Sequence, residues 1–192
     1  MSILRLTAES RNGRTVISHS EFTAPLKIAN PFYRDGCTEV MMMAASAGIL
    51  EGDEYDIEIT VRENASLKFT AQSYSKIFRA DKTGAEQRVR ITVESGGSLI
   101  YMPCPVIPFA DSIFDSRTEV RLKSDSSFVM TDILACGRAA MKERFAFGSY
   151  RSRTAVYCDD RLCFLDNQKL VPSEAELSGI GFFERHSHTG MM

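Results

Sequence analysis

The sequence lacks the features that mark several common classes of protein. Its formal net charge is −2 and its pI is about 6.0, so it has no basic surface of the kind that nucleic acids or anionic membranes attract. Its longest apolar run, residues 40–50, is about half as long as a membrane span. Arg5 and Glu9 fall where a signal peptide has its apolar stretch. We therefore expect no nucleic-acid partner, no membrane partner and no secretion.

Residues for common catalytic and metal chemistry are also sparse. The five cysteines are an odd number without a CxxC pair, which indicates reduced thiols in a cytoplasmic protein. No histidine has an evident nucleophile as a partner, and no glycine-rich phosphate loop is present. An ordinary hydrolase, kinase or dehydrogenase is therefore poorly supported.

Strand patterns dominate what is present. Apolar and polar residues alternate over residues 55–61, 67–71, 89–93 and 128–130, as in strands with one buried face. Asn12-Gly13 predicts a two-residue hairpin turn. The one helix that we predict is short, near residues 172–177. We expect a single domain over residues 1–192.

A repeat runs through these strands. Ser66, Ser98 and Ser127 each follow an apolar strand end and a polar turn, and each precedes an apolar strand start, at intervals of roughly 30 residues. If each unit is a hairpin that cannot bury its own apolar face, successive units must stack. The sequence predicts a mainly β fold, either stacked antiparallel hairpins in layered sheets or a solenoid-like arrangement, with little helix. The alternative is a coincidence among ordinary turns.

Three acids extend the apolar faces of predicted strands. Asp53, Asp132 and Asp166 each share strand parity with apolar residues two and four positions away. A buried carboxylate is costly unless it is paired, protonated or used. The three could give weak oxygen contacts to a divalent cation. Alternatively, each could lie at a strand end and cap a turn.

Five segments resemble, in order, motifs of the urease accessory protein family UreD, also called UreH. They are residues 46–53 (SAGILEGD), residues 70–79 (TAQSYSKIFR), residues 102–109 (MPCPVIPF), Cys136-Gly-Arg138 and Glu143-Arg-Phe145.

The resemblance implies a non-catalytic scaffold with a mainly β fold. Such a scaffold would bind apo-urease and the accessory protein UreF, which recruits the GTPase UreG, so that nickel reaches the urease active site. It would hold no permanent cofactor, only transient, weakly bound nickel. Asp53, Asp132 and Asp166 match acidic positions associated with nickel passage. Lys76 and Arg138 would be ion-pair or interface residues, or solvated strand-edge charges.

The chain departs from the family at its C-terminal end. Family members usually continue beyond the point that matches Met192, so the chain resembles a form that lacks the C-terminal segment, part of which helps to hold UreF. Phe182 and Phe183 are adjacent, and on a strand they would point to opposite faces. We therefore expect one of them to be exposed or to be covered by another molecule.

Two other functions stay open. The protein could be a structural adaptor between urease and UreF without nickel passage. It could also be a β-fold hydrolase that uses Asp132 and Asp166 as acid and base, which would require the carboxyl groups to lie about 5–10 Å apart across an open cleft.

Overall fold

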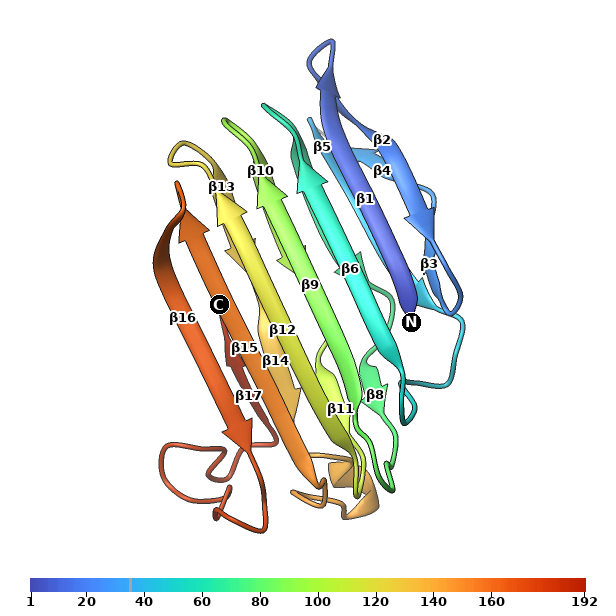
Figure 1. Cartoon of the computed structure of the whole chain (residues 1–192), viewed down its shortest axis with the longest axis vertical. Coiled ribbons are helices and arrows are strands. Elements are labelled where there is room, and N and C mark those ends of the chain that lie inside the picture. The colour runs from blue at the N-terminus through green and yellow to red at the C-terminus, as the bar shows by residue number, and fades with distance from the viewer. Residues whose placement is uncertain (35) are drawn as a thin grey trace.

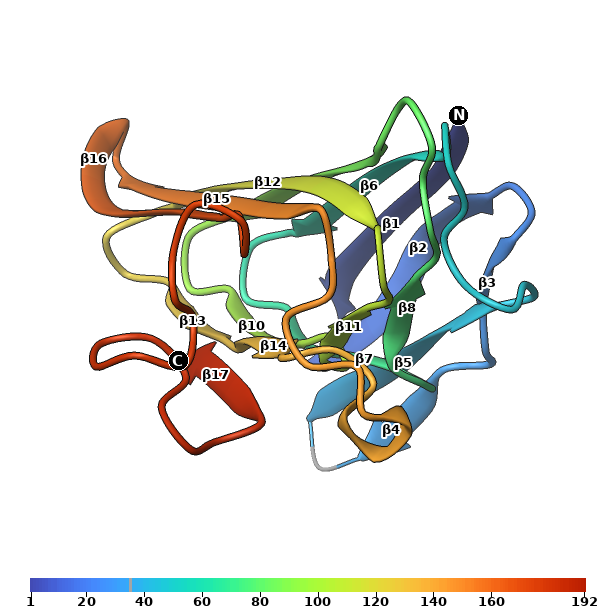
Figure 2. The same ribbon diagram turned by 90° about the horizontal axis from the view of Figure 1, so that it is seen from below.

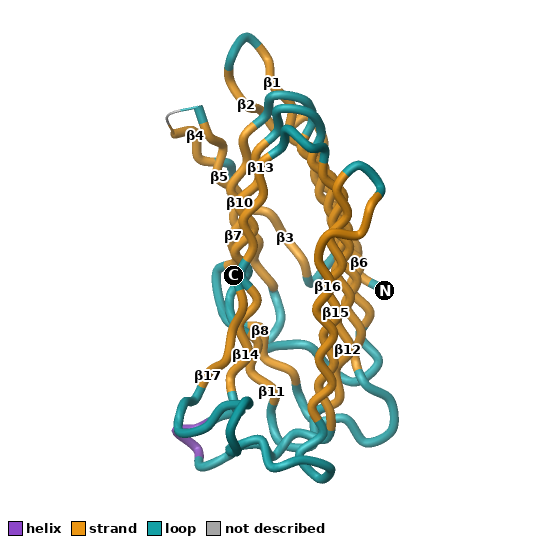
Figure 3. The backbone as a smooth tube through the Cα atoms, turned by 90° about the vertical axis from the view of Figure 1, so that its left-hand side faces the viewer, coloured by secondary structure: helices purple, strands orange, loops and turns teal. Residues whose placement is uncertain are grey.

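The computed structural model describes residues 1–34 and 36–192. Its regular structure is almost entirely β, arranged in two layers (Figures 1 and 2). One layer is a seven-stranded sheet, here called sheet A. The other layer is formed by two smaller sheets, B and C, which lie end to end (Figure 3).

The strand order defines each sheet. Sheet A contains β16 (Arg161–Leu170), β15 (Ser149–Cys158), β12 (Ile113–Leu122), β9 (Ala85–Val93), β6 (Glu54–Val61), β1 (Ser2–Arg11) and β2 (Arg14–Phe22). Sheet B contains β13 (Ser127–Met130), β10 (Ser98–Met102), β7 (Ser66–Ala71), β5 (Cys37–Ala44) and β3 (Leu26–Ile28), with β4 (Phe32–Arg34) also paired to β5. Sheet C contains β17 (His188–Met191), β14 (Asp132–Ala135), β11 (Val106–Pro108) and β8 (Ser75–Ile77).

The chain winds as a solenoid through these sheets. It passes from sheet A to sheet B to sheet C in three successive coils, β6–β7–β8, β9–β10–β11 and β12–β13–β14. Equivalent strands of neighbouring coils pair in parallel, as β6 does with β9 and β9 with β12. The prediction of a mainly β, layered and solenoid-like fold is confirmed.

The serine repeat marks the stacking. Ser98 lies in register with Ser66 on one side and with Ser127 on the other. The expected antiparallel hairpins at these turns are wrong, because the strands on either side of each turn belong to different sheets. The main-chain bonds run between coils: the Glu94 amide donates to the Val61 carbonyl at 2.9 Å, and the Ser98 amide to the Ala65 carbonyl at 2.8 Å.

Antiparallel pairing occurs where the chain enters and leaves the coils. β1 and β2 form the hairpin predicted at Asn12-Gly13, and both turn residues have positive φ, as a tight two-residue turn requires. β15 and β16 form a second hairpin, and β17 pairs antiparallel with β14. β2 and β16 are the two edges of sheet A (Figure 1).

The core lies between the two layers. Residues at alternate positions of the sheet A strands are buried against sheets B and C, as the alternating patterns predict. The largest buried side chains are those of Tyr150, Phe69, Phe183, Leu4, Leu6, Ile57 and Ile59. The apolar alternation therefore fixes which face of sheet A turns inward.

The helix predicted near residues 172–177 is wrong. The segment forms turns in which the Glu174 and Ala175 amides both donate to the Val171 carbonyl, and Leu177 is buried. Six residues are too few to repay the cost of helix nucleation. Within the described residues, the helical element is a single 3-10 turn, η1 (Ala139–Met141). The described part of the chain contains no helix long and apolar enough to cross a membrane.

Candidate functional site

Polar side chains form a row across the inner face of sheet A. The cross-strand register places Tyr55, Gln87, Ser116, Ser152 and Gln168 side by side on five neighbouring strands. Most inward positions of the same sheet are apolar, so this row stands out as a line of polar side chains between the layers. We call it the interior polar row.

The next inward-facing position along β12, β15 and β16 also carries side chains with oxygen atoms. Thr118, Thr154 and Asp166 are consecutive there. Thr154 is only 1% exposed. Its hydroxyl oxygen and Oδ2 of Asp166 are buried without a hydrogen-bond partner among the described residues. Unpaired buried oxygens are uncommon in folded proteins because each one costs stability.

Asp132 reaches this region from the opposite layer. It lies on β14 in sheet C, and its Oδ2 accepts a hydrogen bond of 3.0 Å from the Ser152 hydroxyl on β15. Burial raises the pKa of Asp132; the Ser152 hydrogen bond lowers that pKa, and the charge on Asp166 raises it further. Asp166 therefore lies close enough to Asp132 for its charge to act on the Asp132 carboxyl group.

Two buried tyrosines lie beside these acids. Burial and the negative charge of Asp132 raise the pKa of Tyr101 and of Tyr150, so both phenols stay protonated at neutral pH. A small cavity of about 10 Å³ is lined by Asp132, Tyr150 and Gln168 together with residues of β17. That volume is close to the minimum for one water molecule.

Asp53 lies apart from the other two acids. Its carboxylate accepts a hydrogen bond of 2.8 Å from the Leu50 amide and so caps a turn, which is the alternative that the sequence left open. Its charge acts on Tyr55, at the far end of the interior polar row. The structure thus brings Asp132 and Asp166 together and places Asp53 near the opposite end. Among the described residues, no three His, Cys, Asp or Glu side chains are placed to hold a metal ion.

Arg138 is held by two contacts. It forms an ion pair with Glu143, with 2.6 Å between Nε and Oε2, and its guanidinium lies 4.1 Å from the centroid of the Phe109 ring. Lys76 is exposed on β8 and makes no ion pair with the residues that the structure describes. Of the two predicted ion-pair or interface residues, Arg138 has a structural partner.

Phe182 and Phe183 lie in turns, not on a strand. Phe182 is 47% exposed, whereas Phe183 is 2% exposed and packs edge-on against Phe145 at 5.1 Å between ring centroids. One of the two phenylalanines is therefore exposed, as expected, although the strand geometry behind that expectation is absent.

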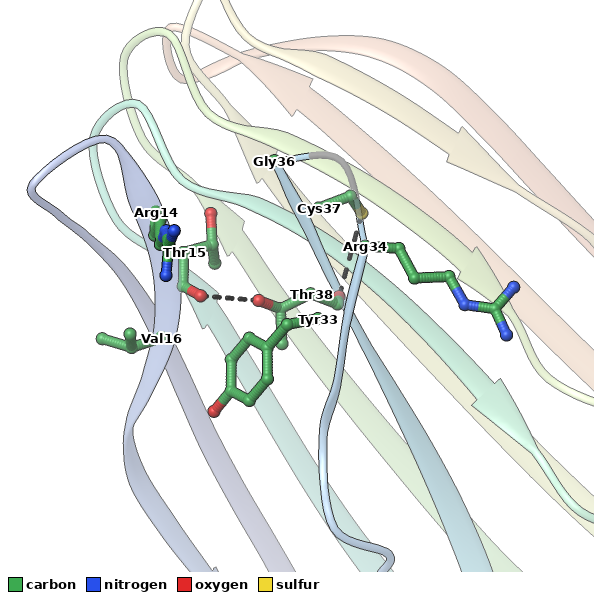
Figure 4. Close-up of a pocket in the computed structure, with 8 residues that line it drawn as sticks. All are labelled: Arg14, Thr15, Val16, Tyr33, Arg34, Gly36, Cys37 and Thr38. Atoms are coloured by element: carbon green, nitrogen blue, oxygen red, sulfur yellow. Dashed lines mark hydrogen bonds between the residues drawn. The ribbon is translucent and has the colours of Figure 1, made fainter.

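A larger surface pocket, of about 610 Å³, lies between β2 and the β4–β5 hairpin. Figure 4 shows the Tyr33 ring on the same side as Thr15 and Thr38, whereas the Arg34 side chain extends away from them. The Thr38 hydroxyl donates to the Thr15 carbonyl at 2.6 Å at the base of the pocket. Sequence reasoning did not identify this pocket.

Fold and site together define a β-solenoid protein whose apolar core is crossed by a row of polar side chains. Comparison with known proteins gives the family: the model of the UreD urease accessory protein family matches residues 2–192. A urease accessory protein UreD of Acetivibrio thermocellus is 44% identical over 193 residues, which cover 100% of this chain and 74% of that protein. A urease accessory protein UreH of Helicobacter hepaticus is 34% identical over 188 residues, with 97% of this chain and 75% of that protein covered. The chain therefore belongs to the UreD urease accessory protein family.

Proposed function

We propose that this protein is a urease maturation factor that acts in the cytoplasm. It binds apo-urease and UreF, and through UreF the GTPase UreG, and it helps to deliver Ni²⁺ to the urease active site. Membership of the UreD family carries the proposal, since the relatives are named urease accessory proteins. Phe182, which is 47% exposed, is a candidate contact for a partner.

We further propose that nickel, as cargo, passes between the two layers along the interior polar row. The supporting observation is the cluster of Asp132, Asp166, Ser152 and Thr154, which offers oxygen atoms, two of them unpaired, inside a β fold. Transit requires weak sites, because a complete ligand set would retain the metal. A passing cation would favour the ionised form of Asp132, which burial otherwise disfavours.

The test is co-expression with a urease operon that lacks its own UreD. The variants are Asp132→Asn, Asp166→Asn and the pair combined, with Asp81→Asn as the control because Asp81 is exposed. We expect normal co-purification with UreF and urease for every variant. The nickel content of urease should fall at least fivefold for the combined variant and stay unchanged for the control.

Two outcomes would contradict parts of the proposal. If the combined variant still supports full nickel loading of urease, the proposal of nickel passage along the interior polar row is wrong. The remaining hypothesis is then a structural adaptor without nickel passage. If the wild-type chain neither co-purifies with urease or UreF nor restores urease activity, the maturation role itself is wrong.

The hydrolase alternative has little support. Asp132 and Asp166 lie on opposite layers, and the cavity beside Asp132 measures about 10 Å³. A paired-carboxylate hydrolase needs an open cleft that admits a sugar ring and a water molecule. We therefore infer a non-catalytic role for the pair.

A further inference from the structure

One edge strand of sheet A has an exposed apolar run. β16 is the last strand of the sheet, and no described strand lies beyond it (Figures 1 and 2). Its residues 162–165 (LCFL) are four consecutive apolar residues. Leu162, Phe164 and Leu165 are each about half exposed, and Cys163 is exposed as well. Such a run on the surface is disfavoured in a protein that stays alone in water, so it indicates an interface.

The opposite edge of the same sheet has a different composition. The consecutive exposed residues of β2 include Ser18, His19, Ser20 and Glu21, all of which are polar. Edge strands of proteins that stay monomeric commonly have charged or polar side chains, which hinder pairing with another chain. Residues 162–165 of β16 lack this protection.

A β-bulge at Cys163 decides which side chains of β16 share a face. Leu162 lies opposite Tyr157 of β15, and Leu165 lies opposite Ala155. Tyr157 and Ala155 are two residues apart on a strand, so they point to the same face of the sheet. Leu162 and Leu165 therefore also share one face, although they are three residues apart.

Charges of opposite sign flank the run. Arg161 precedes it and Asp166 follows it, and they lie opposite Cys158 and Thr154 of β15. Both side chains therefore point to the inner face, to which Thr154 points. Neither Arg161 nor Asp166 forms an ion pair within the described part of the chain. Arg161 is exposed and Asp166 is partly buried.

Residues 161–166 (RLCFLD) are consequently complementary to a second copy of themselves. If two such strands run antiparallel about a two-fold axis at the centre of the run, Arg161 of one copy lies opposite Asp166 of the second copy. Leu162 then lies opposite Leu165 of the second copy. Residues that lie opposite each other in a continuous sheet must share a face, and the bulge satisfies this condition. A strand without the bulge would place the two leucines on opposite faces.

We propose that this protein forms a symmetric homodimer in which the β16 edges pair antiparallel over residues 161–166, so that the two copies of sheet A become one continuous sheet. The opposite charges at the two ends of the run favour a second copy over an unrelated strand. A contact of this symmetry closes at two copies. It is a small interface, so we expect a Kd of about 1–100 μM. The proposal is independent of the role in urease maturation.

Sedimentation velocity of the purified chain tests the dimer over concentrations from about 1 to 300 μM. A reductant is present because Cys163 is exposed and could cross-link two copies. We expect a reversible equilibrium between monomer and dimer. Leu165→Lys places a charge in the leucine contact and should weaken dimerisation at least tenfold. Arg161→Glu places like charges opposite each other and should weaken it at least threefold.

Two control variants match these substitutions. Leu50→Lys changes a loop leucine of nearly the same exposure, 53% against 50% for Leu165. Arg14→Glu reverses an exposed charge on β2, the opposite edge of sheet A. Neither control should change the Kd of the dimer. Circular dichroism verifies that each variant is folded.

Amide hydrogen exchange locates the contact. Amides within residues 161–166 should exchange more slowly at high than at low protein concentration, whereas those of β2 should not change. The proposal is wrong if the wild-type chain stays monomeric over the whole range or assembles beyond two copies. It is also wrong if both β16 variants dimerise as the wild type does.

A partner protein is the alternative occupant of this edge. If the wild-type chain is monomeric and residues 161–166 become protected only after urease or UreF is added, the partner covers the edge and the homodimer is wrong. Urease activation is not measured in these experiments, so their failure leaves the maturation role intact.

Discussion

The Ser152 hydroxyl donates a hydrogen bond of 3.0 Å to Oδ2 of Asp132, and this bond joins sheet A to sheet C through the interior of the molecule. Without Ser152, the Asp132 carboxylate would lack its hydrogen-bond donor, because no other described residue donates to it. The contact therefore links the two layers, and it partly offsets the rise in the pKa of Asp132 that burial causes.

Ser152→Ala should destabilise the protein at pH 7. Removing the donor leaves a buried carboxylate without its partner, which costs about 1–3 kcal/mol. Urea unfolding followed by circular dichroism measures the loss. Ser124→Ala, at an exposed turn position, is the matched control and should change stability by less than about 0.5 kcal/mol. An equal effect of the two substitutions would show that the Ser152–Asp132 bond contributes nothing.

Asp132→Asn should stabilise the protein at neutral pH but not at acid pH. Because the pKa of Asp132 is raised above 3.8 in the folded state, its ionisation reduces stability as pH rises through and above that value. Asparagine stays neutral and can still accept from Ser152. The difference in unfolding free energy between variant and wild type should therefore grow from pH 3.5 to pH 7.

Asp125 is a control because its pKa is shifted in the opposite direction to that of Asp132. A hydrogen bond from Ser95 lowers the pKa of Asp125, so its contribution to stability is lost as pH falls. Asp125→Asn should therefore show no gain at neutral pH. A gain for Asp132→Asn that is the same at pH 3.5 and pH 7 would contradict the ionisation argument.

The fold was predictable from the sequence because the solenoid repeats itself. Stacked coils place equivalent residues in register, so the recurring serines at 66, 98 and 127 report the architecture directly. The turn sequences do not show whether the two flanking strands pair with each other. The same polar residues are compatible with a hairpin turn and with a corner between two sheets. Which strand accepts the main-chain hydrogen bonds depends on neighbouring coils, and these are distant in sequence.

Part of the interior polar row also has a sequence signal that the strand-parity argument did not use. The segments 114–120 (FDSRTEV) and 150–156 (YRSRTAV) share an aromatic residue, serine, threonine and valine at alternate positions, and they pair in register. Small polar residues at two inward positions of consecutive long strands would have identified Ser116, Thr118, Ser152 and Thr154. Asp53 could not be separated from Asp132 in this way, because its turn-capping hydrogen bond depends on local backbone geometry.

Glu51 should hold the loop of the next coil in place. Its carboxylate accepts hydrogen bonds from the amides of Asp81, Lys82 and Thr83 at 2.7–3.1 Å, and these bonds lower its pKa to about 2. Glu51→Ala should increase amide hydrogen exchange of residues 81–83 severalfold, while core strands stay protected. In the wild type, the same exchange should accelerate only as pH falls from about 4.5 toward 2 (after correction for intrinsic rates), because the lowered pKa keeps the carboxylate ionised above that range. Unchanged exchange in Glu51→Ala would contradict this role.

The adjacent phenylalanines should differ sharply in their effect on stability. Phe183 is 2% exposed and packs against Phe145, so Phe183→Ala leaves a cavity and should cost about 3–5 kcal/mol. Phe182 is 47% exposed, and Phe182→Ala should change stability by less than about 1 kcal/mol. Urea unfolding of both variants gives the comparison, with each serving as the control for the other.

If Phe182 contacts a partner, Phe182→Ala should also weaken co-purification with UreF or urease without lowering the stability of the isolated chain. Equal destabilisation by the two substitutions would show that the turn of residues 181–186 packs differently in solution.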